Sequence, residues 1–195
     1  YKLPELRVRT HSVGVDLAAD RGDGDLFRKV DLSATAIHAE KRRTAGDRAR
    51  KVGELVNAEP GEAWLVWADT DYDAEAVMAV LPDAVEVHGR MDADRKADLL
   101  LGFVDRGGIL LTKPKLAGFG LNFQHCARQA FVGGTYSYEA FYQAVRRSWR
   151  FGQAREVHAH VVMAATEAAM WHVLHGKAEQ HSEMKAQMFD ASRRA

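Results

Sequence analysis

The sequence predicts an α/β fold in which helices cover both faces of a mainly parallel sheet. Short apolar runs of the kind that form buried strands alternate along the chain with longer amphipathic stretches. Strands separated by helices pair in parallel, because each helix carries the chain back to the edge at which the previous strand began. Hydrophobic residues make up 47% of the 195 residues, which is enough for a packed core and argues against global disorder.

Residues 1–58 are predicted to form a strand, a turn and one long helix. Apolar and polar residues alternate over 8–17, which is typical of a strand, and Gly and Asp residues over 20–25 favour a turn. A charged, Ala-rich helix is expected over 31–58, with Ser33 as its N-cap. We interpret its basic residues as a solvated helix face, and DNA contact by part of that face is the alternative. These residues are Lys41, Arg42, Arg43, Arg48, Arg50 and Lys51.

Beyond Pro60 and Gly61, which end this helix, strand and helix patterns alternate along the chain. Strands are predicted at residues 64–68, 85–88, 109–112, 130–132 and 157–163. Helices are predicted at residues 71–81, 92–105 and 138–151, with two more in 166–195. Asp92 is expected to be the N-cap of the second of these helices. Ligands of parallel sheets bind at the carboxyl ends of the strands, so residues that directly follow a strand are candidate site residues.

Composition limits the partners that the chain can have. Lys and Arg together number 27, as do Asp and Glu, so any binding to nucleic acid must come from local basic patches. The single cysteine, Cys126, excludes an internal disulfide and a multi-cysteine zinc site, and it suits a reducing compartment such as the cytoplasm. No apolar run approaches the ~20 residues of a membrane span, so we expect no membrane partner. The first residue is Tyr1, which predicts that the chain is part of a longer protein.

A cluster of arginines defines the first candidate site. Residues 138–151 contain no Gly or Pro and are predicted to form one helix. Positions i, i+3, i+4 and i+7 of a helix share one face, and that series is occupied by Gln143, Arg146, Arg147 and Arg150. Like charges at this spacing repel each other, so helix stability does not explain the cluster. Planar guanidiniums bind phosphate through paired hydrogen bonds, so the cluster predicts a phosphate site, with a solvated basic face as the alternative.

A second candidate site directly follows the strand predicted at 109–112. Thr112 and Lys113 offer a hydroxyl and a positive charge to a phosphate backbone. Further along, Gly118 and Gly120 allow a tight turn whose backbone N–H groups can approach anionic oxygens. A structural turn without a ligand is the alternative.

Both stretches resemble motifs of superfamily-two helicases, in the form used by the Swi/Snf-like, DEAD/DEAH-type ATP-dependent translocases. Residues 112–122 are similar to motif V. The match to motif VI is Gln143-x-x-x-Arg147-x-x-Arg150-x-Gly152-Gln153. The two motifs occur in the order found in the family, and the resemblance extends over most of residues 64–163. It implies a RecA-like three-layer sandwich with a mainly parallel sheet.

The resemblance also implies how the chain is divided and where it diverges. It implies a lead-in from a preceding lobe, a helicase C-terminal RecA-like lobe and a C-terminal helical extension, at residues 1–31, 32–165 and 166–195. Residues 133–138 stand where the family has an Asp and a Trp-Asn-Pro stretch. Arg146 replaces a small or acidic residue, and Trp149 replaces a common His. These departures indicate a divergent bacterial or phage-type relative.

Each candidate residue receives an implied role from the resemblance. Arg150 would be the arginine finger, Arg147 a second phosphate ligand, and Gln143 would position the γ-phosphate or the attacking water. The residues implied on the nucleotide side are Gly118, Gly120 and Asn122. Those implied on the nucleic-acid side are Thr112, Lys113 and the turn His88-Gly89-Arg90, for which a surface turn is the alternative. ATP and Mg²⁺ would be held mainly by the other lobe, because the sequence contains no Gly-x-x-x-x-Gly-Lys-Ser/Thr loop.

These expectations combine into one function and two alternatives. The chain is predicted to be the second lobe of an ATP-dependent DNA helicase or translocase that acts on duplex DNA beside an N-terminal RecA-like lobe. Alone, it is predicted to be inactive. The first alternative is a RecA-like module that binds nucleic acid or protein without ATP turnover. The second, a dinucleotide or methyl-donor enzyme, fits less well because its Gly-rich turn should follow the first strand. His158 and His160 are interpreted as ordinary strand residues and not as metal ligands.

Overall fold

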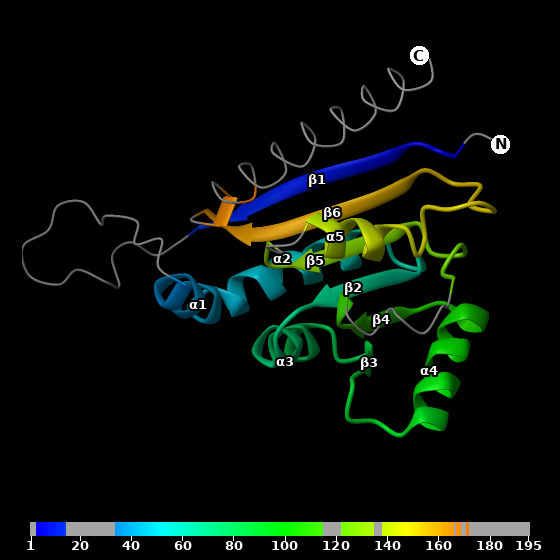
Figure 1. Ribbon diagram of the computed structural model, residues 1–195, viewed down its shortest axis with the longest axis horizontal. Helices are drawn as coiled ribbons and strands as arrows, with labels where there is room; N and C mark the ends of the chain where they lie inside the picture. The colour runs from blue at the N-terminus through cyan, green and yellow to red at the C-terminus, as the bar shows by residue number, and fades with distance from the viewer. Residues whose placement is uncertain are drawn as a thin grey trace, which may run out of the picture.

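The computed structural model describes residues 3–14, 34–114, 122–134, 138–165, 167–168 and 171. Within these ranges, six strands form one sheet with the order β1-β6-β5-β2-β4-β3, and every pairing is parallel (Figure 1). The strands are β1 (Leu6–Val13), β2 (Trp64–Ala68), β3 (Val85–Val87), β4 (Ile109–Thr112), β5 (Arg128–Val132) and β6 (Val157–Ala164). The predicted α/β fold with a mainly parallel sheet is confirmed.

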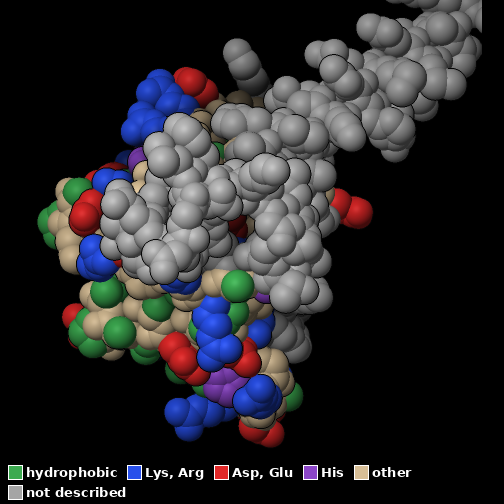
Figure 2. All heavy atoms as spheres, turned by 90° about the vertical axis from the view of Figure 1, so that its left-hand side faces the viewer, with side chains coloured by type: hydrophobic (Ala, Val, Ile, Leu, Met, Phe, Trp, Pro, Cys, Tyr) green, Lys and Arg blue, Asp and Glu red, His purple; other side chains and the backbone are tan. Residues whose placement is uncertain are grey.

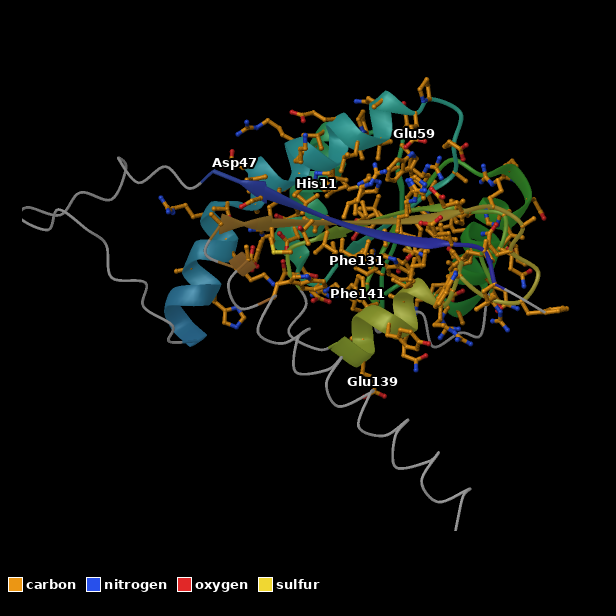
Figure 3. The ribbon with its side chains drawn as sticks, turned by 90° about the horizontal axis from the view of Figure 1, so that it is seen from above. His11, Asp47, Glu59, Phe131, Glu139 and Phe141 are labelled. Atoms are coloured by element: carbon orange, nitrogen blue, oxygen red, sulfur yellow. The ribbon has the colours of Figure 1, made fainter. Side chains whose placement is uncertain are left out.

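Five helices in the described ranges pack on the two faces of this sheet. They are α1 (Ala34–Arg43), α2 (Ala45–Ala58), α3 (Asp71–Val80), α4 (Ala93–Arg106) and α5 (Tyr138–Val145). Figure 3 shows α2 and α5 on opposite faces, which gives three layers. Successive side chains of β2 point to opposite faces of the sheet. Leu65 and Trp67 join the core beneath α4 and α5, whereas Trp64 and Val66 join the core beneath α2 and α3. None of the helices described is long and apolar enough to cross a membrane.

The helix predicted over 31–58 is interrupted at Thr44, and the structure has two helices there, α1 and α2. The hydroxyl of Thr44 donates to the carbonyl of Lys41 (3.5 Å) and accepts a hydrogen bond from Arg48. Side chains that bond to nearby backbone groups compete with the helical hydrogen bonds. The prediction of one continuous helix is therefore wrong at this position.

Apart from the helices predicted over 31–58 and 138–151, the predicted boundaries lie close to the observed ones. β1 begins and ends earlier than the predicted 8–17, and it pairs along its whole length with β6 at the edge of the sheet. Asp92 is the N-cap of α4, where its carboxylate accepts from the backbone N–H groups of Asp94 (2.9 Å) and Arg95 (3.4 Å). The proposed domain boundaries stay predictions. Three further predictions fall outside the described residues: the N-cap at Ser33, the turn at 20–25 and the helices over most of 166–195.

Two of the basic residues predicted to be solvated are buried instead. Lys41 is 3% exposed and Arg48 is 0% exposed. Arg48 forms ion pairs with Asp73 of α3 (2.6 Å) and with Glu167 (3.5 Å), and Lys41 lies 3.8 Å from Glu167. Buried charges require such partners, so this ionic cluster joins the first three helices to the residues after β6. The solvated-face prediction holds for the exposed members, Arg42, Arg43 and Arg50.

Two histidines join β1 to β6. Nε2 of His11 and Nδ1 of His160 are 2.9 Å apart, and their rings stack with centroids 5.1 Å apart. One ring must donate and the other accept, so this hydrogen bond exists only while at least one ring is neutral. Burial, together with the nearby charges of His11 and His158, lowers the pKa of His160 from 6.5 to about 4.

We expect the free energy of unfolding to fall as the pH is lowered from 6.5 to about 4. In that window the unfolded chain binds a proton at His160 that the folded chain does not, so acid favours the unfolded state and the full stability is present above the window. The whole shift corresponds to about 3.5 kcal/mol, at about 1.4 kcal/mol for each unit of pKa, and solvent screening makes the actual loss smaller. Urea unfolding above and within the window measures it. In His160→Gln most of this pH dependence should disappear, and an undiminished dependence would show that other groups cause it.

Candidate functional site

Four side chains of the arginine-rich stretch line one pocket of about 190 Å³. They are Gln143, Arg146, Arg147 and Arg150, the four residues that helical spacing places on one face. No carboxylate is among the described residues that line it, so the pocket presents positive charge alone. We call it the arginine pocket. The catalytic roles assigned to these residues stay predictions.

The helix that leads into the arginine pocket is shorter than predicted. α5 ends at Val145 and residues 146–150 continue as tight turns, so the prediction of one continuous helix is wrong in its second half. The carbonyl of Arg147, which a continuing helix would use, accepts from the backbone N–H of Phe123 instead (2.8 Å). Gly152 then adopts a φ of +94°, a left-handed conformation that suits glycine and ends the turns.

Gln153 connects these turns to the segment before β5. Its side chain is 2% exposed, and its Nε2 lies within hydrogen-bond distance of three carbonyls. These belong to Gln124 (2.9 Å), Cys126 (3.3 Å) and Ser148 (3.4 Å). The segment before β5 lies at the amino end of the sheet, and Figure 1 shows the chain after α5 at that end too. The arginine pocket is therefore an exception to the rule that ligands of parallel sheets bind at the carboxyl ends.

Gln129 of β5 is a second buried amide that supports the arginine pocket. Its Nε2 donates to the carbonyl of Val145, the last residue of α5 (3.1 Å), and its Oε1 accepts from Nε1 of Trp67 (2.9 Å). Both amides were missed as candidates from the sequence. Gln129 directly precedes the strand predicted at 130–132, and nothing in the local sequence distinguishes it, whereas Gln153 is the last position of the motif VI match.

The guanidiniums of the arginine pocket are only partly satisfied. Within the described part of the chain, Nε of Arg147 and Nε of Arg150 are buried without a hydrogen-bond acceptor. Burial lowers the pKa of Arg147, and the neighbouring charge of Arg150 lowers it further. An anion would supply the missing acceptors and neutralise the repelling charges, so the pocket favours an anionic group.

Arg150 also connects the two predicted motifs. Its Nη1 donates to Oδ1 of Asn122, the last residue of the motif V match. Arg146 is held differently: its Nη1 donates to the hydroxyl of Tyr142 (3.3 Å), and its guanidinium lies 5.7 Å from the centre of that ring. The other two residues predicted on the nucleotide side lie outside the described residues: Gly118 and Gly120.

A second pocket, of about 410 Å³, lies at the carboxyl ends of β3 and β4. It is lined by Asp71, Glu75, Glu86, His88, Gly89, Arg90 and Lys113. We call it the mixed-charge pocket. Figure 2 looks onto the end of the sheet at which the strands finish and shows basic, acidic and histidine side chains side by side there. Four of its lining residues are those predicted on the nucleic-acid side: His88, Gly89, Arg90 and Lys113.

Two buried polar side chains shape the mixed-charge pocket. The hydroxyl of Thr112, which is 6% exposed, donates to the carbonyl of Val87 (2.8 Å) and so joins β4 to β3. Nζ of Lys96 in α4 donates to the carbonyl of Gly89 (2.8 Å), which fixes the turn after β3. A nucleic-acid contact by Thr112 stays a prediction. Lys96 was missed because nothing in the local sequence distinguishes it from other lysines of charged helices.

The two pockets lie at opposite ends of the strands. Lys113 directly follows β4 at its carboxyl end and lines the mixed-charge pocket. Asn122 contacts Arg150 at the amino end. The two ends of the motif V match therefore reach different pockets.

The described residues contain no group of three or more His, Cys, Asp and Glu side chains that could hold a metal ion. His158 contacts Glu156 (2.5 Å), and His160 contacts His11, so both histidines make contacts within the fold.

No family model matches the sequence, and no curated protein matches it. Solved structures are similar in fold. The C-terminal part of the Fun30 ATPase domain matches with a TM-score of 0.58 and 19% identity, covering 66% of this chain. The chain has a RecA-like α/β fold. It spans only 44% of the Fun30 chain, so the likeness concerns one part of that protein.

Two further structures share this RecA-like fold. The S. cerevisiae Dbp5 C-terminal domain, solved with Gle1 and IP6, matches with a TM-score of 0.57 and 14% identity, over 69% of this chain and 80% of that one. Mss116p DEAD-box helicase domain 2, bound to an RNA duplex, matches with a TM-score of 0.56 and 14% identity, over 67% and 53%. At such identities the likeness establishes the fold, and the predicted RecA-like three-layer architecture is confirmed.

Proposed function

We propose that the chain is the second RecA-like lobe of an ATP-dependent helicase or translocase. The observation that carries this proposal is the arginine pocket, where Gln143, Arg147 and Arg150 converge. The fold supports it, since the similar structures include part of an ATPase domain and a DEAD-box helicase domain. In this proposal residues 32–165 form the lobe together with strand β1, which pairs with β6, residues 166–195 form an extension, and the protein acts in the cytoplasm.

The arginine pocket is proposed to receive the phosphates of ATP bound by another lobe of the same polypeptide. During transfer of the γ-phosphoryl group to water, negative charge spreads over the phosphoryl oxygens, and guanidiniums positioned in advance stabilise it. Arg150 would act as the arginine finger, Arg147 as a second phosphate ligand, and the Gln143 amide would orient the water. Mg²⁺ takes several oxygen ligands, which three guanidiniums and one amide do not supply, so the other lobe would hold it.

The mixed-charge pocket is proposed to contact the nucleic-acid backbone through Lys113, Arg90 and His88. Because one end of the motif V match reaches each pocket, closure of the lobes around ATP could change the position of Lys113 relative to the nucleic acid. Duplex DNA is the first candidate, through the Swi/Snf-like resemblance. The RNA duplex bound to Mss116p makes duplex RNA the second.

A binding module without ATP turnover is the alternative function. The mixed-charge pocket is the observation that favours this alternative, because nucleic acid could bind there without a second lobe. Hydrolysis distinguishes the two: the two-lobe polypeptide should hydrolyse ATP, and this chain alone should not. If the two-lobe polypeptide does not hydrolyse ATP, the ATPase proposal is rejected and the binding module remains as the function.

Lys113→Ala is expected to weaken the binding of a short DNA duplex by about three- to tenfold at low salt, and to reduce the salt dependence of log Kd by about 1, because one phosphate contact is lost. Fluorescence anisotropy over a salt series measures both. Arg155→Ala is the matched control, because Arg155 also pairs with a carboxylate, Glu62 (2.9 Å), but does not line the pocket. Equal losses in the two variants would contradict a nucleic-acid role for the pocket. A duplex RNA of the same sequence, measured in parallel, shows which nucleic acid binds more tightly.

A further inference from the structure

The carboxylate of Asp71 lies among the cationic side chains of the mixed-charge pocket. Its Oδ1 is 2.6 Å from Nζ of Lys113, and its Oδ2 is 3.5 Å from Nη2 of Arg90. The hydrogen bond from Lys113 lowers the pKa of Asp71, and the charges of Lys113, Arg90 and His88 lower it further. One carboxylate therefore faces all three side chains that are proposed to hold a nucleic-acid backbone.

Three separate elements bring these groups together. Asp71 lies in the first turn of α3, directly after the N-cap Thr70, whose hydroxyl accepts from the backbone N–H of Asp73 (3.2 Å). Arg90 lies in the turn after β3, and Lys113 follows β4. The side chains of Asp71 and Arg90 are 65% and 87% exposed, so their ion pair contributes little to the stability of the fold. Because stability does not explain this arrangement, we look for its role in ligand binding.

A phosphate group would need the same donors that Asp71 now occupies. The pocket is lined by three carboxylates, of Asp71, Glu75 and Glu86, against the cations Arg90 and Lys113 and the histidine. With the histidine neutral, the carboxylates outnumber the cations, so a phosphate that approaches is repelled unless a carboxylate moves away.

We propose that Asp71 occupies the position of a backbone phosphate in the free protein, and that its displacement sets the affinity of this pocket for nucleic acid. This inference rests on the proposed function, because it takes nucleic acid as the ligand of the mixed-charge pocket. The exchange is between ion pairs: Lys113 and Arg90 leave the carboxylate and bind the phosphate. Each contact is thereby kept weak and reversible, as a protein that moves along nucleic acid requires.

Asp71→Asn removes the competing charge and keeps the size of the side chain. We expect it to bind a short DNA duplex about three- to tenfold more tightly at low salt, an increase that shrinks as salt screens the charges. Asp83→Asn is the matched control, because Asp83 is exposed, carries the same charge and precedes β3 at the opposite end of the sheet. It should bind as the wild type does. Unchanged or weaker binding by Asp71→Asn, or an equal gain in Asp83→Asn, would overturn the inference.

Titration with inorganic phosphate, followed by the backbone amide NMR signals of His88, Arg90 and Lys113, tests Asp71 without nucleic acid. We expect phosphate to shift these signals at lower concentration in Asp71→Asn than in the wild type. If that holds while neither protein binds DNA or RNA, Asp71 is confirmed as the competitor and nucleic acid is rejected as the ligand. If both proteins bind DNA and phosphate equally, the proposed function stands and the role of Asp71 is rejected. If neither ligand binds to either protein, both proposals fall.

Discussion

Replacing Arg150 with alanine in the two-lobe polypeptide is expected to lower ATP turnover by on the order of 10³-fold or more. The physical reason is that the guanidinium would be placed where negative charge develops on the transferred phosphoryl group, so its loss raises the barrier and not only the affinity for ATP. The fold should persist, because the side chain of Arg150 lies partly exposed at the amino end of the sheet and bonds to Asn122. Steady-state kinetics would show the loss in kcat.

Arg146→Ala is the matched control for this variant. Arg146 lines the same pocket, but its guanidinium is held by the ring and hydroxyl of Tyr142. Arg146→Ala removes one positive charge from the pocket, as Arg150→Ala does, but it keeps the guanidinium of Arg150 that contacts Asn122. We expect a much smaller loss of turnover than in Arg150→Ala. Equal losses would mean that net charge, and not a positioned arginine, supports catalysis.

Asp73→Ala is expected to destabilise the folded chain by about 3–5 kcal/mol, the usual consequence of removing one member of a buried ion pair. Asp73 and Arg48 are both 0% exposed and their charged atoms are 2.6 Å apart. Without Asp73, the carboxylate that remains beside the buried guanidinium among the described residues is that of Glu167, at 3.5 Å. Urea unfolding at neutral pH measures the change in the free energy of unfolding.

A surface ion pair provides the comparison for Asp73→Ala. Glu54→Ala removes the partner of Lys51 in an exposed pair and should lower the free energy of unfolding far less than Asp73→Ala does. The double variant Arg48→Met/Asp73→Leu replaces the buried charges with apolar groups and should recover much of the loss. If Asp73→Ala cost no more than Glu54→Ala, the buried pair would not be a main source of stability.

The sheet could be predicted from the sequence because its signal is local. Runs such as Trp64–Ala68 and residues 109–111 are apolar throughout, as is typical of strands covered on both faces, and the intervening helices require parallel pairing. Asp92 as an N-cap is equally local, since the side chain bonds to N–H groups two and three residues later.

The burial of Arg48 and the early end of α5 could not be predicted, because they depend on contacts that local sequence patterns do not show. The burial of Arg48 requires Asp73, 25 positions later, and no local pattern distinguishes Arg48 from the exposed arginines beside it. The second half of the predicted helix was wrong because Phe123 bonds to the carbonyl of Arg147 and Gln153 to that of Ser148, both across the turns. The four side chains of the arginine pocket nevertheless come together. Their place at the amino end of the sheet could not be derived from the rule for strand ends.

The central claim is that the arginine pocket serves an ATP site shared with another lobe and coupled to nucleic acid. ATP hydrolysis by the two-lobe polypeptide, measured with and without duplex DNA, tests this claim most directly. We predict turnover that rises when DNA is added and that is absent from this chain alone. No hydrolysis under either condition, together with salt-sensitive DNA binding, would contradict the claim and leave a RecA-like lobe that binds nucleic acid without using ATP.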